Sequence, residues 1–171
     1  MLLSKEYPNY LTSTCLNWLP LLEDDKFKDI IIDSLRFLVV ENRITVYGFV
    51  IMRNHFHLIW QIMEHHSRET VQRDFLRFTS QQILKLLRND KSQFLESVIV
   101  NSKDRTRQIW ERNSLNIPLW TQSVLVQKLN YIHDNPVRAG ICKHPENYKY
   151  SSARYYLLNE KNWDFLSHYE G

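Results

Sequence analysis

Two β-rich runs that follow each other closely constrain the fold of this chain more than any other feature. Residues 43–52 read RITVYGFVIM and residues 55–63 read HFHLIWQIM, and only Arg53 and Asn54 separate them. Both runs contain many of the β-branched and aromatic residues that favour strands. A short polar connection between two strands indicates a β-hairpin. The chain is therefore expected to form a sheet that includes an antiparallel pair over residues 43–63.

Helical and extended patterns alternate around this hairpin. Apolar residues recur at helical spacing over 23–41 and 67–89, whereas residues 10–19 have the composition of a strand. Within the irregular stretch 90–118, residues 108–110 could belong to a fourth strand. A last helix begins at Thr121 and is expected to end near the Asn135–Pro136 step, because a residue before proline avoids the helical conformation. This βαββαβ order predicts an α+β fold, an antiparallel sheet with helices on one face.

The bulk properties fit one folded domain. The chain has 171 residues, of which 43% are hydrophobic and 24% are charged, as in ordinary globular proteins. We expect a single domain over residues 1–171, with residues 143–171 as a C-terminal tail. The formal net charge of +3 permits a polyanionic partner but does not by itself indicate one.

The cysteines and the hydropathy pattern bear on the cellular compartment. Cys15 and Cys142 lie far apart and form neither a CxxC motif nor a disulfide pattern, which fits a reducing compartment. No stretch approaches the ~18 apolar residues of a membrane span, so no membrane partner is expected. The sequence therefore predicts a cytoplasmic protein.

Two histidines at alternate positions of the second hairpin strand are candidate metal ligands. Alternation along a strand puts His55 and His57 on one face and Phe56 on the other. Neutral imidazole is a common metal ligand, and two rings on one strand can share an ion. An HxH pattern alone is weak support, because most such pairs are ordinary strand histidines.

Tyr131 and Asn135 lie one turn apart in the last predicted helix. Helical spacing puts Tyr131 off the apolar stripe, so its phenol is displayed rather than buried. Asn135 would lie on the same face if the helix extends that far. Its alternative role is structural, because Asn followed by Pro is also typical of the N-cap of a new helical turn, here residues 136–139 closed by Gly140.

Three segments together resemble a known family. The stretch YGFVIMRNHFHLIW is similar to the His-hydrophobic-His signature of the IS200-like single-tyrosine (Y1) transposases, which are HUH endonucleases. The stretch YIHDNPVRAGICKHPENYKYSSARYY resembles the C-terminal signature of their REP-associated branch, and RDFLRFTSQQ also looks like this family. The resemblance touches most of residues 10–156 and implies a ferredoxin-like or RRM-like fold with an additional helix that carries the tyrosine.

The resemblance also implies an activity and a site. His55, His57 and Asn135 would bind a divalent metal ion, Mg²⁺ or Mn²⁺, and Tyr131 would attack single-stranded or hairpin DNA to form a 5′-phosphotyrosine. The family pattern gives no choice between a monomer and a homodimer. An altered stretch at residues 115–118 leaves open an alternative function, a domesticated protein that binds DNA hairpins without cleaving them. The expected phosphate-binding side chains are Arg77, Lys85, Arg138 and Arg154.

Overall fold

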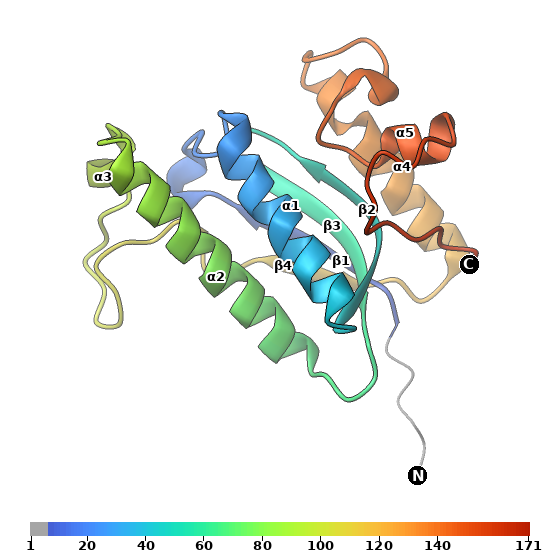
Figure 1. Ribbon diagram of the computed structural model, residues 1–171, viewed down its shortest axis with the longest axis horizontal. Helices are drawn as coiled ribbons and strands as arrows, with labels where there is room; N and C mark the ends of the chain where they lie inside the picture. The colour runs from blue at the N-terminus through green and yellow to red at the C-terminus, as the bar shows by residue number, and fades with distance from the viewer. Residues whose placement is uncertain (1–6) are drawn as a thin grey trace.

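The computed structural model describes residues 7–171 and contains one four-stranded antiparallel sheet with the strand order β2-β3-β1-β4 (Figure 1). This is the strand order of the ferredoxin-like fold, so the predicted α+β architecture is confirmed. The strands are β1 (Asn9–Thr14), β2 (Ile44–Ile51), β3 (His55–Ile62) and β4 (Leu115–Pro118). The helices are α1 (Asp25–Val40), α2 (Arg68–Asn89), α3 (Phe94–Ser97), α4 (Gln122–Arg138) and α5 (Ala153–Leu157), with short 3-10 helices at Leu16–Trp18 and Pro145–Asn147. No helix in residues 7–171 is long and apolar enough to cross a membrane.

The hairpin predicted from residues 43–63 is the β2-β3 pair. The two strands pair antiparallel from Ile44 opposite Ile62 to Ile51 opposite Phe56, with a register shift between Val46 and Gly48. On its other edge β3 pairs with β1, which places the strand that bears the histidines inside the sheet. A strand with neighbours on both sides has its backbone hydrogen bonds satisfied and gives its side chains fixed positions.

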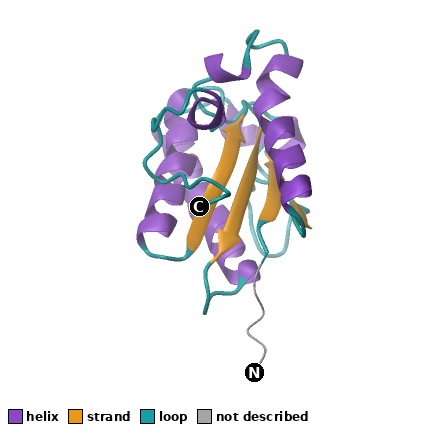
Figure 2. Cartoon of the chain, turned by 90° about the vertical axis from the view of Figure 1, so that its right-hand side faces the viewer, coloured by secondary structure: helices purple, strands orange, loops and turns teal. Residues whose placement is uncertain are grey.

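Helices cover both faces of the sheet, and each face has its own apolar cluster. Figure 2 shows the strands between helices on the two sides. Helices α1 and α2 pack on one face over a large core that includes Leu11, Phe56 and Trp60. Helix α4 packs on the other face, where Leu129 and Ile132 join a smaller cluster with β-strand side chains. The tyrosine-bearing helix is thus separated from α1 and α2 by the sheet.

The fourth strand is not where the sequence pattern placed it. Residues 108–110 contribute one isolated bridge, between Trp110 and Cys15, and β4 is Leu115–Pro118. Trp110 is buried because its indole packs in the core and donates from Nε1 to Thr79 Oγ1 at 3.1 Å. Trp110 was therefore assigned to a strand because aromatic residues are common in strands, whereas its role is to pack in the core. The actual strand, LNIP, is a short edge strand with little apolar alternation.

Helix α4 does not end before Pro136, contrary to the prediction. It continues to Arg138, and the Ala139 N–H donates to the Asn135 carbonyl at 3.0 Å. The proline ring is buried, so packing in the last turn offsets the hydrogen bond that proline removes. The alternative role of Asn135 as the N-cap of a separate turn is therefore wrong, because this residue lies inside a continuous helix.

The C-terminal segment packs against β2. Ser151 makes an isolated bridge with Val50 and Leu166 makes one with Val46. The Ser152 hydroxyl interacts with both the N–H and the carbonyl of Phe49, and Phe165 is buried in the main core. Residues 143–171 are thus an integral part of the packed structure, although their sequence shows no regular period.

Candidate functional site

His55 and His57 lie side by side on the sheet face that α4 covers. Their ring centroids are 4.9 Å apart, while Phe56 between them points into the opposite core. His57 is 5% exposed and His55 is half-buried. The alternation of β3 therefore brings two imidazoles together at a partly covered surface.

Two hydroxyl groups on β1 determine how the His57 ring is held. Its Nδ1 lies 2.7 Å from Thr12 Oγ1 and 2.9 Å from the Tyr10 hydroxyl. Its Nε2 lies 3.2 Å from the amide nitrogen of Asn135, which is a donor. With Nε2 accepting, the ring proton is on Nδ1, and the Nε2 lone pair points toward Asn135 on α4.

His55 is oriented by the residue that precedes it. Its Nδ1 lies 2.8 Å from Asn54 Oδ1, an acceptor, so Nδ1 carries the proton in this pair as well. Both rings therefore have their Nδ1 protons bound by neighbouring oxygens, and the Asn135 side chain contacts both rings. Histidines that bind metal ions usually have such an outer hydrogen bond.

Burial keeps both imidazoles neutral near physiological pH. Desolvation is the main reason why the pKa of His57 is lowered to about 3, and the nearby His55, Arg138 and Lys128 contribute to the same shift. Desolvation also lowers the pKa of His55, although a hydrogen bond with Asn135 opposes that shift. A neutral imidazole keeps a lone pair for a metal ion, whereas a protonated one does not.

Tyr131 on α4 faces this histidine pair. Its ring centroid is 5.7 Å from that of His57, and the side chain is 40% exposed. The helix comes close to the sheet because β2 has a glycine beneath it: a Cβ at Gly48 would lie 2.5 Å from Leu129 Cδ1. The phenol is therefore both close to the histidines and open to solvent.

Asn135 lies one helical turn beyond Tyr131 and contacts both histidines. Its amide nitrogen meets His57 Nε2 at 3.2 Å, and its side chain also hydrogen-bonds His55. The structure thus brings together the four residues His55, His57, Tyr131 and Asn135, which are far apart in the sequence.

Two cations flank the tyrosine on the same helix. Lys128 Nζ lies 5.7 Å from the centre of the Tyr131 ring and 4.9 Å from that of Tyr10. The Arg138 guanidinium carbon lies 4.1 Å from the centre of the Tyr131 ring and forms a half-exposed ion pair with Asp134. The region around the phenol is therefore electropositive, which favours a phosphate.

Sequence reasoning missed three of these neighbours. Lys128 could have been found, because it lies three residues before Tyr131 and shares its helical face. Tyr10 and Thr12 could not, because their contact with His57 depends on the β1-β3 register, in which Thr12 pairs with His57. No local pattern in the sequence encodes that pairing.

The other predicted phosphate-binding residues do not join this site. Arg77 and Lys85 are exposed on α2, on the other side of the sheet from Tyr131. Arg154 on α5 makes a two-point ion pair with Glu160, at 2.8 and 3.1 Å. Arg138 is thus the one member of the predicted set that the structure places beside the tyrosine.

The side chains present fit a divalent metal ion with nitrogen and amide-oxygen ligands. The Nε2 atom of His57 accepts from the Asn135 amide nitrogen, and the Asn135 side chain also contacts His55. Residues 7–171 contain no group of three or more His, Cys, Asp or Glu side chains that could hold a metal ion. The third protein ligand would therefore be the Asn135 oxygen, and Mn²⁺ accepts this mixed donor set more readily than Mg²⁺.

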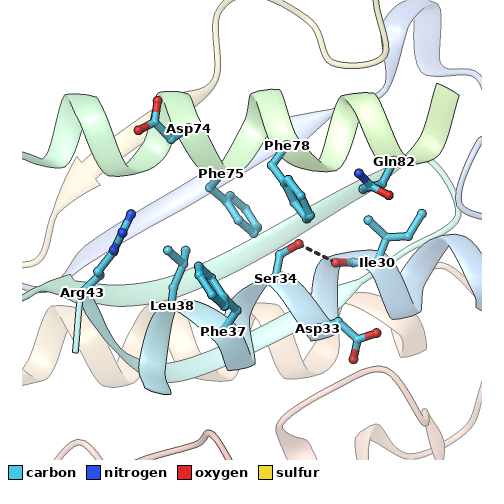
Figure 3. A pocket seen from close by; sticks show the side chains of 10 residues that line it. All are labelled: Ile30, Asp33, Ser34, Phe37, Leu38, Arg43, Asp74, Phe75, Phe78 and Gln82. Atoms are coloured by element: carbon cyan, nitrogen blue, oxygen red, sulfur yellow. Dashed lines mark hydrogen bonds between the residues drawn. The ribbon is translucent and has the colours of Figure 1, made fainter. Parts of the chain in front are cut away.

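A mainly apolar pocket lies elsewhere, between α1 and α2 (Figure 3). Phe75 and Phe78 from α2 face Phe37 and Leu38 from α1 around a cavity of about 470 Å³. None of its ten lining residues is a histidine, cysteine or tyrosine. The His55, His57 and Tyr131 side chains lie instead on the opposite face of the sheet.

Comparisons with known proteins agree with the architecture. No protein-family model and no curated protein matches the sequence. Among solved structures, the chain is similar to a REP-associated tyrosine transposase bound to a REP hairpin, with a TM-score of 0.66 and 12% identity over 98% of this chain and 86% of that one. A candidate transposase from Deinococcus radiodurans R1 has a TM-score of 0.52 and 13% identity over 75% of this chain and 90% of that one. The resemblance to REP-associated tyrosine transposases is thus confirmed at the level of the fold.

Proposed function

We propose that this chain is a transposase-type enzyme that cleaves and rejoins single-stranded DNA through a covalent bond to Tyr131. The observation that carries the proposal is the packing of the half-exposed Tyr131 phenol against His57, one turn from Asn135. The fold similarity to a REP-associated tyrosine transposase and to a second, candidate transposase supports the same conclusion.

The proposed reaction needs one nucleophile and one leaving group. The Tyr131 oxygen attacks phosphorus, a bond forms between them, and the bond from phosphorus to the 3′ oxygen breaks. The leaving oxygen takes up a proton and becomes a free 3′-hydroxyl, while the phenol has given up its own. The phosphodiester bond energy is kept in the 5′-phosphotyrosine, so a 3′-hydroxyl can reverse the step and rejoin the strand.

The side chains around Tyr131 supply binding and orientation in this proposal. Lys128 and Arg138 attract the phosphate and offset charge that develops on its oxygens. Thr12 and Asn54 hold the two imidazoles in fixed orientations. A divalent cation held by His55, His57 and Asn135 would make the phosphate more electrophilic.

Several features favour single-stranded, hairpin-associated DNA as the substrate. The first of the similar structures is itself bound to a REP hairpin. The phosphate must approach a phenol that lies between a helix and a sheet, and an unpaired strand can bend to reach it. Both cysteines are unpaired, which agrees with the proposed action in the reducing cytoplasm.

The proposal is tested by trapping the covalent intermediate. The protein is incubated with labelled single-stranded hairpin DNA and Mn²⁺ or Mg²⁺, and adducts are separated on a denaturing gel. We expect an adduct with the wild type and none after EDTA treatment. Tyr131→Phe should abolish it, whereas Tyr7→Phe, a comparably exposed tyrosine outside the site, should not.

Two outcomes would contradict the proposal. An adduct that persists in Tyr131→Phe would show that another residue is the nucleophile. Tight binding to hairpins without any adduct, over many hairpin sequences, would instead support the alternative of a DNA-hairpin-binding protein that does not cleave.

A further inference from the structure

A polar groove of about 1100 Å³ lies between α2 and residues 104–116, on the β4 side of the molecule. Six arginines and three acidic residues line it, so its charge is positive. The arginines are Arg68, Arg73, Arg77, Arg105, Arg107 and Arg112. The acidic residues are Glu69, Asp104 and Glu111.

Several polar groups of this groove have no partner among residues 7–171. Arg68, Arg73, Arg105 and Arg112 form ion pairs with nearby carboxylates. Arg77 and Arg107 form none within the described chain, and the buried Arg107 Nε and Asn116 Oδ1 have no hydrogen-bond partner there. Unpaired cations beside unsatisfied polar atoms favour an anionic ligand that can also form hydrogen bonds.

The groove wall is connected through β1 to the histidine positions of β3. The Glu111 N–H donates to the Thr14 carbonyl at 2.8 Å, and Thr14 pairs with His55. One step along, Leu115 pairs with Thr12, which pairs with His57. Adjacent strands are ~4.8 Å apart, so the backbone at the groove edge is roughly 10 Å from the backbone of the histidine strand, around the β4 edge of the sheet.

An exposed tryptophan stands between the groove and the histidines. Trp18 is 64% exposed, and its ring centroid is 6.2 Å from that of His55. Its backbone has a φ of 58° and that of Asn17 a φ of 52°; asparagine tolerates this left-handed conformation, but it is costly for a residue as bulky as tryptophan. The Asn17 N–H donates to the groove residue Glu111 at 2.7 Å, which helps to hold this strained turn.

We infer that these features form one track for single-stranded DNA, which leads from Tyr131 past Trp18 into the groove. The inference rests on the proposed function, because it assumes that a DNA strand enters the tyrosine site. Trp18 would stack on an unpaired base, and Arg77 and Arg107 would bind phosphates. The track explains why an indole is held exposed beside the histidines and why two arginines lack carboxylate partners.

The test measures DNA binding in a Tyr131→Phe background, so that no adduct interferes. The probes are fluorescent thymidine oligonucleotides of roughly 6 and roughly 20 nucleotides, lengths on either side of a common single-strand site size. We expect Arg77→Ala to weaken binding of the long probe about tenfold and to reduce its salt slope by about 0.7, with little effect on the short probe. Lys85→Ala is the matched control, because Lys85 lies on the same helix but outside the groove.

Trp18 is tested in the same assay. We expect Trp18→Ala to weaken binding of the long probe about tenfold and Trp18→Phe to retain most of the affinity, because a phenyl ring also stacks. Trp120→Ala is the control, since Trp120 is 65% exposed but packs against Tyr7. A merely structural role of Trp18 would lower the unfolding midpoint of Trp18→Ala without a selective loss of the long probe.

Three results would overturn the track. The first is an equal loss of affinity for the long probe in Arg77→Ala and Lys85→Ala. The second is a loss of affinity in only one of Arg77→Ala and Trp18→Ala. The third is tighter binding of a duplex than of the long single strand. Failure of the proposed cleavage looks different, because the long probe would still bind through the groove while the wild type formed no adduct on any hairpin.

Discussion

At the scale of single residues, the outer hydrogen bonds of the histidines fix the orientation of the two rings beside Tyr131. Thr12 and Tyr10 engage Nδ1 of His57, and Asn54 engages Nδ1 of His55. If these bonds were absent, each ring could rotate or change tautomer, and the two imidazoles would lose their fixed orientation. Thr12, Tyr10 and Asn54 take no part in the proposed chemistry, but they hold the two histidines in position for it.

Thr12→Val should weaken metal binding without unfolding the protein. Valine has nearly the same shape but cannot accept the proton of His57 Nδ1, so we expect Mn²⁺ affinity to fall about 10- to 100-fold. Calorimetric titration measures the affinity, and Thr45→Val on β2 is the control. Unchanged Mn²⁺ affinity in Thr12→Val would show that this hydroxyl does not position the ligand.

Substitutions at Asn135 distinguish a metal ligand from a structural residue. Asn135→Ala removes the oxygen and should lower Mn²⁺ affinity, whereas Asn135→Asp keeps an oxygen, adds a negative charge and should retain or increase it. The two variants are compared by the same titration, with thermal unfolding as a check on folding. Equal losses in both variants would contradict the assignment of the oxygen as a ligand.

At the scale of elements, the close packing of α4 on β2 determines how near Tyr131 lies to the histidines. Gly48 lies under Leu129, and Ile132 and Leu125 complete the contact with the small apolar cluster. Pro136 is buried in the last turn of the same helix, so the helix keeps Asn135 in place beyond the point where the sequence predicted its end.

Gly48→Ala should disturb this packing. The added methyl group would meet Leu129 Cδ1 at 2.5 Å, and overpacking of this kind costs about 1–3 kcal/mol of unfolding free energy. Urea denaturation measures the loss. Combined with Leu129→Ala, the substitution should cost less than the sum of the two single changes, and simple additivity would show that the two positions do not collide.

At the scale of the whole molecule, the C-terminal segment closes the fold around β2. The Tyr156 hydroxyl donates to the Tyr47 carbonyl, and His133 on α4 meets Ser152 at 2.8 Å in a buried contact. Burial lowers the pKa of His133 to about 4, so this contact is made by a neutral ring near physiological pH. The tail thereby links α4, the sheet and the main core.

Phe165→Ala should destabilise the whole chain although it lies far from the site. Phe165 is 3% exposed and packs against Phe49, so its truncation should cost about 3–5 kcal/mol. Thermal unfolding measures the change, and Leu158→Ala in the same segment, where the side chain is 48% exposed, should have little effect. Similar small effects in both would show that the tail is not part of the cooperative unit.

The arrangement of Tyr131 also makes a prediction about chain partnership. Its ring contacts His57 of the same chain, so under the proposed function each molecule carries a complete site. A mixture of the Tyr131→Phe and His57→Ala proteins should therefore form no adduct with hairpin DNA. Recovery of the adduct in the mixture would mean that the tyrosine of one chain serves the histidines of another.

The local sequence determined most of the secondary structure and the face of each strand. Alternation in HFHLIWQI and helical spacing in SVLVQKLNYI follow from backbone geometry, which needs no information about the rest of the chain. These periods placed His55 and His57 on one face and displayed Tyr131. Two secondary-structure predictions were wrong. Trp110 was assigned to a strand although it is a core residue in an irregular segment, and α4 continues past Pro136 because buried contacts around the proline outweigh its helix-breaking tendency.

Only the tertiary structure decided which residues meet. The β1-β3 register brings Thr12 to His57 over a separation of 45 residues, and the docking of α4 brings Asn135 to the same ring over 78. Such contacts depend on long-range strand pairing and on how closely helices pack on the sheet, as where the missing side chain of Gly48 leaves room for Leu129. The periodicity of a short segment contains no information about either. The tertiary structure also placed Arg77 and Lys85 on the opposite side of the sheet from Arg138. The sequence could not show this, because a charged residue on a helix surface does not indicate which face of the sheet its helix covers.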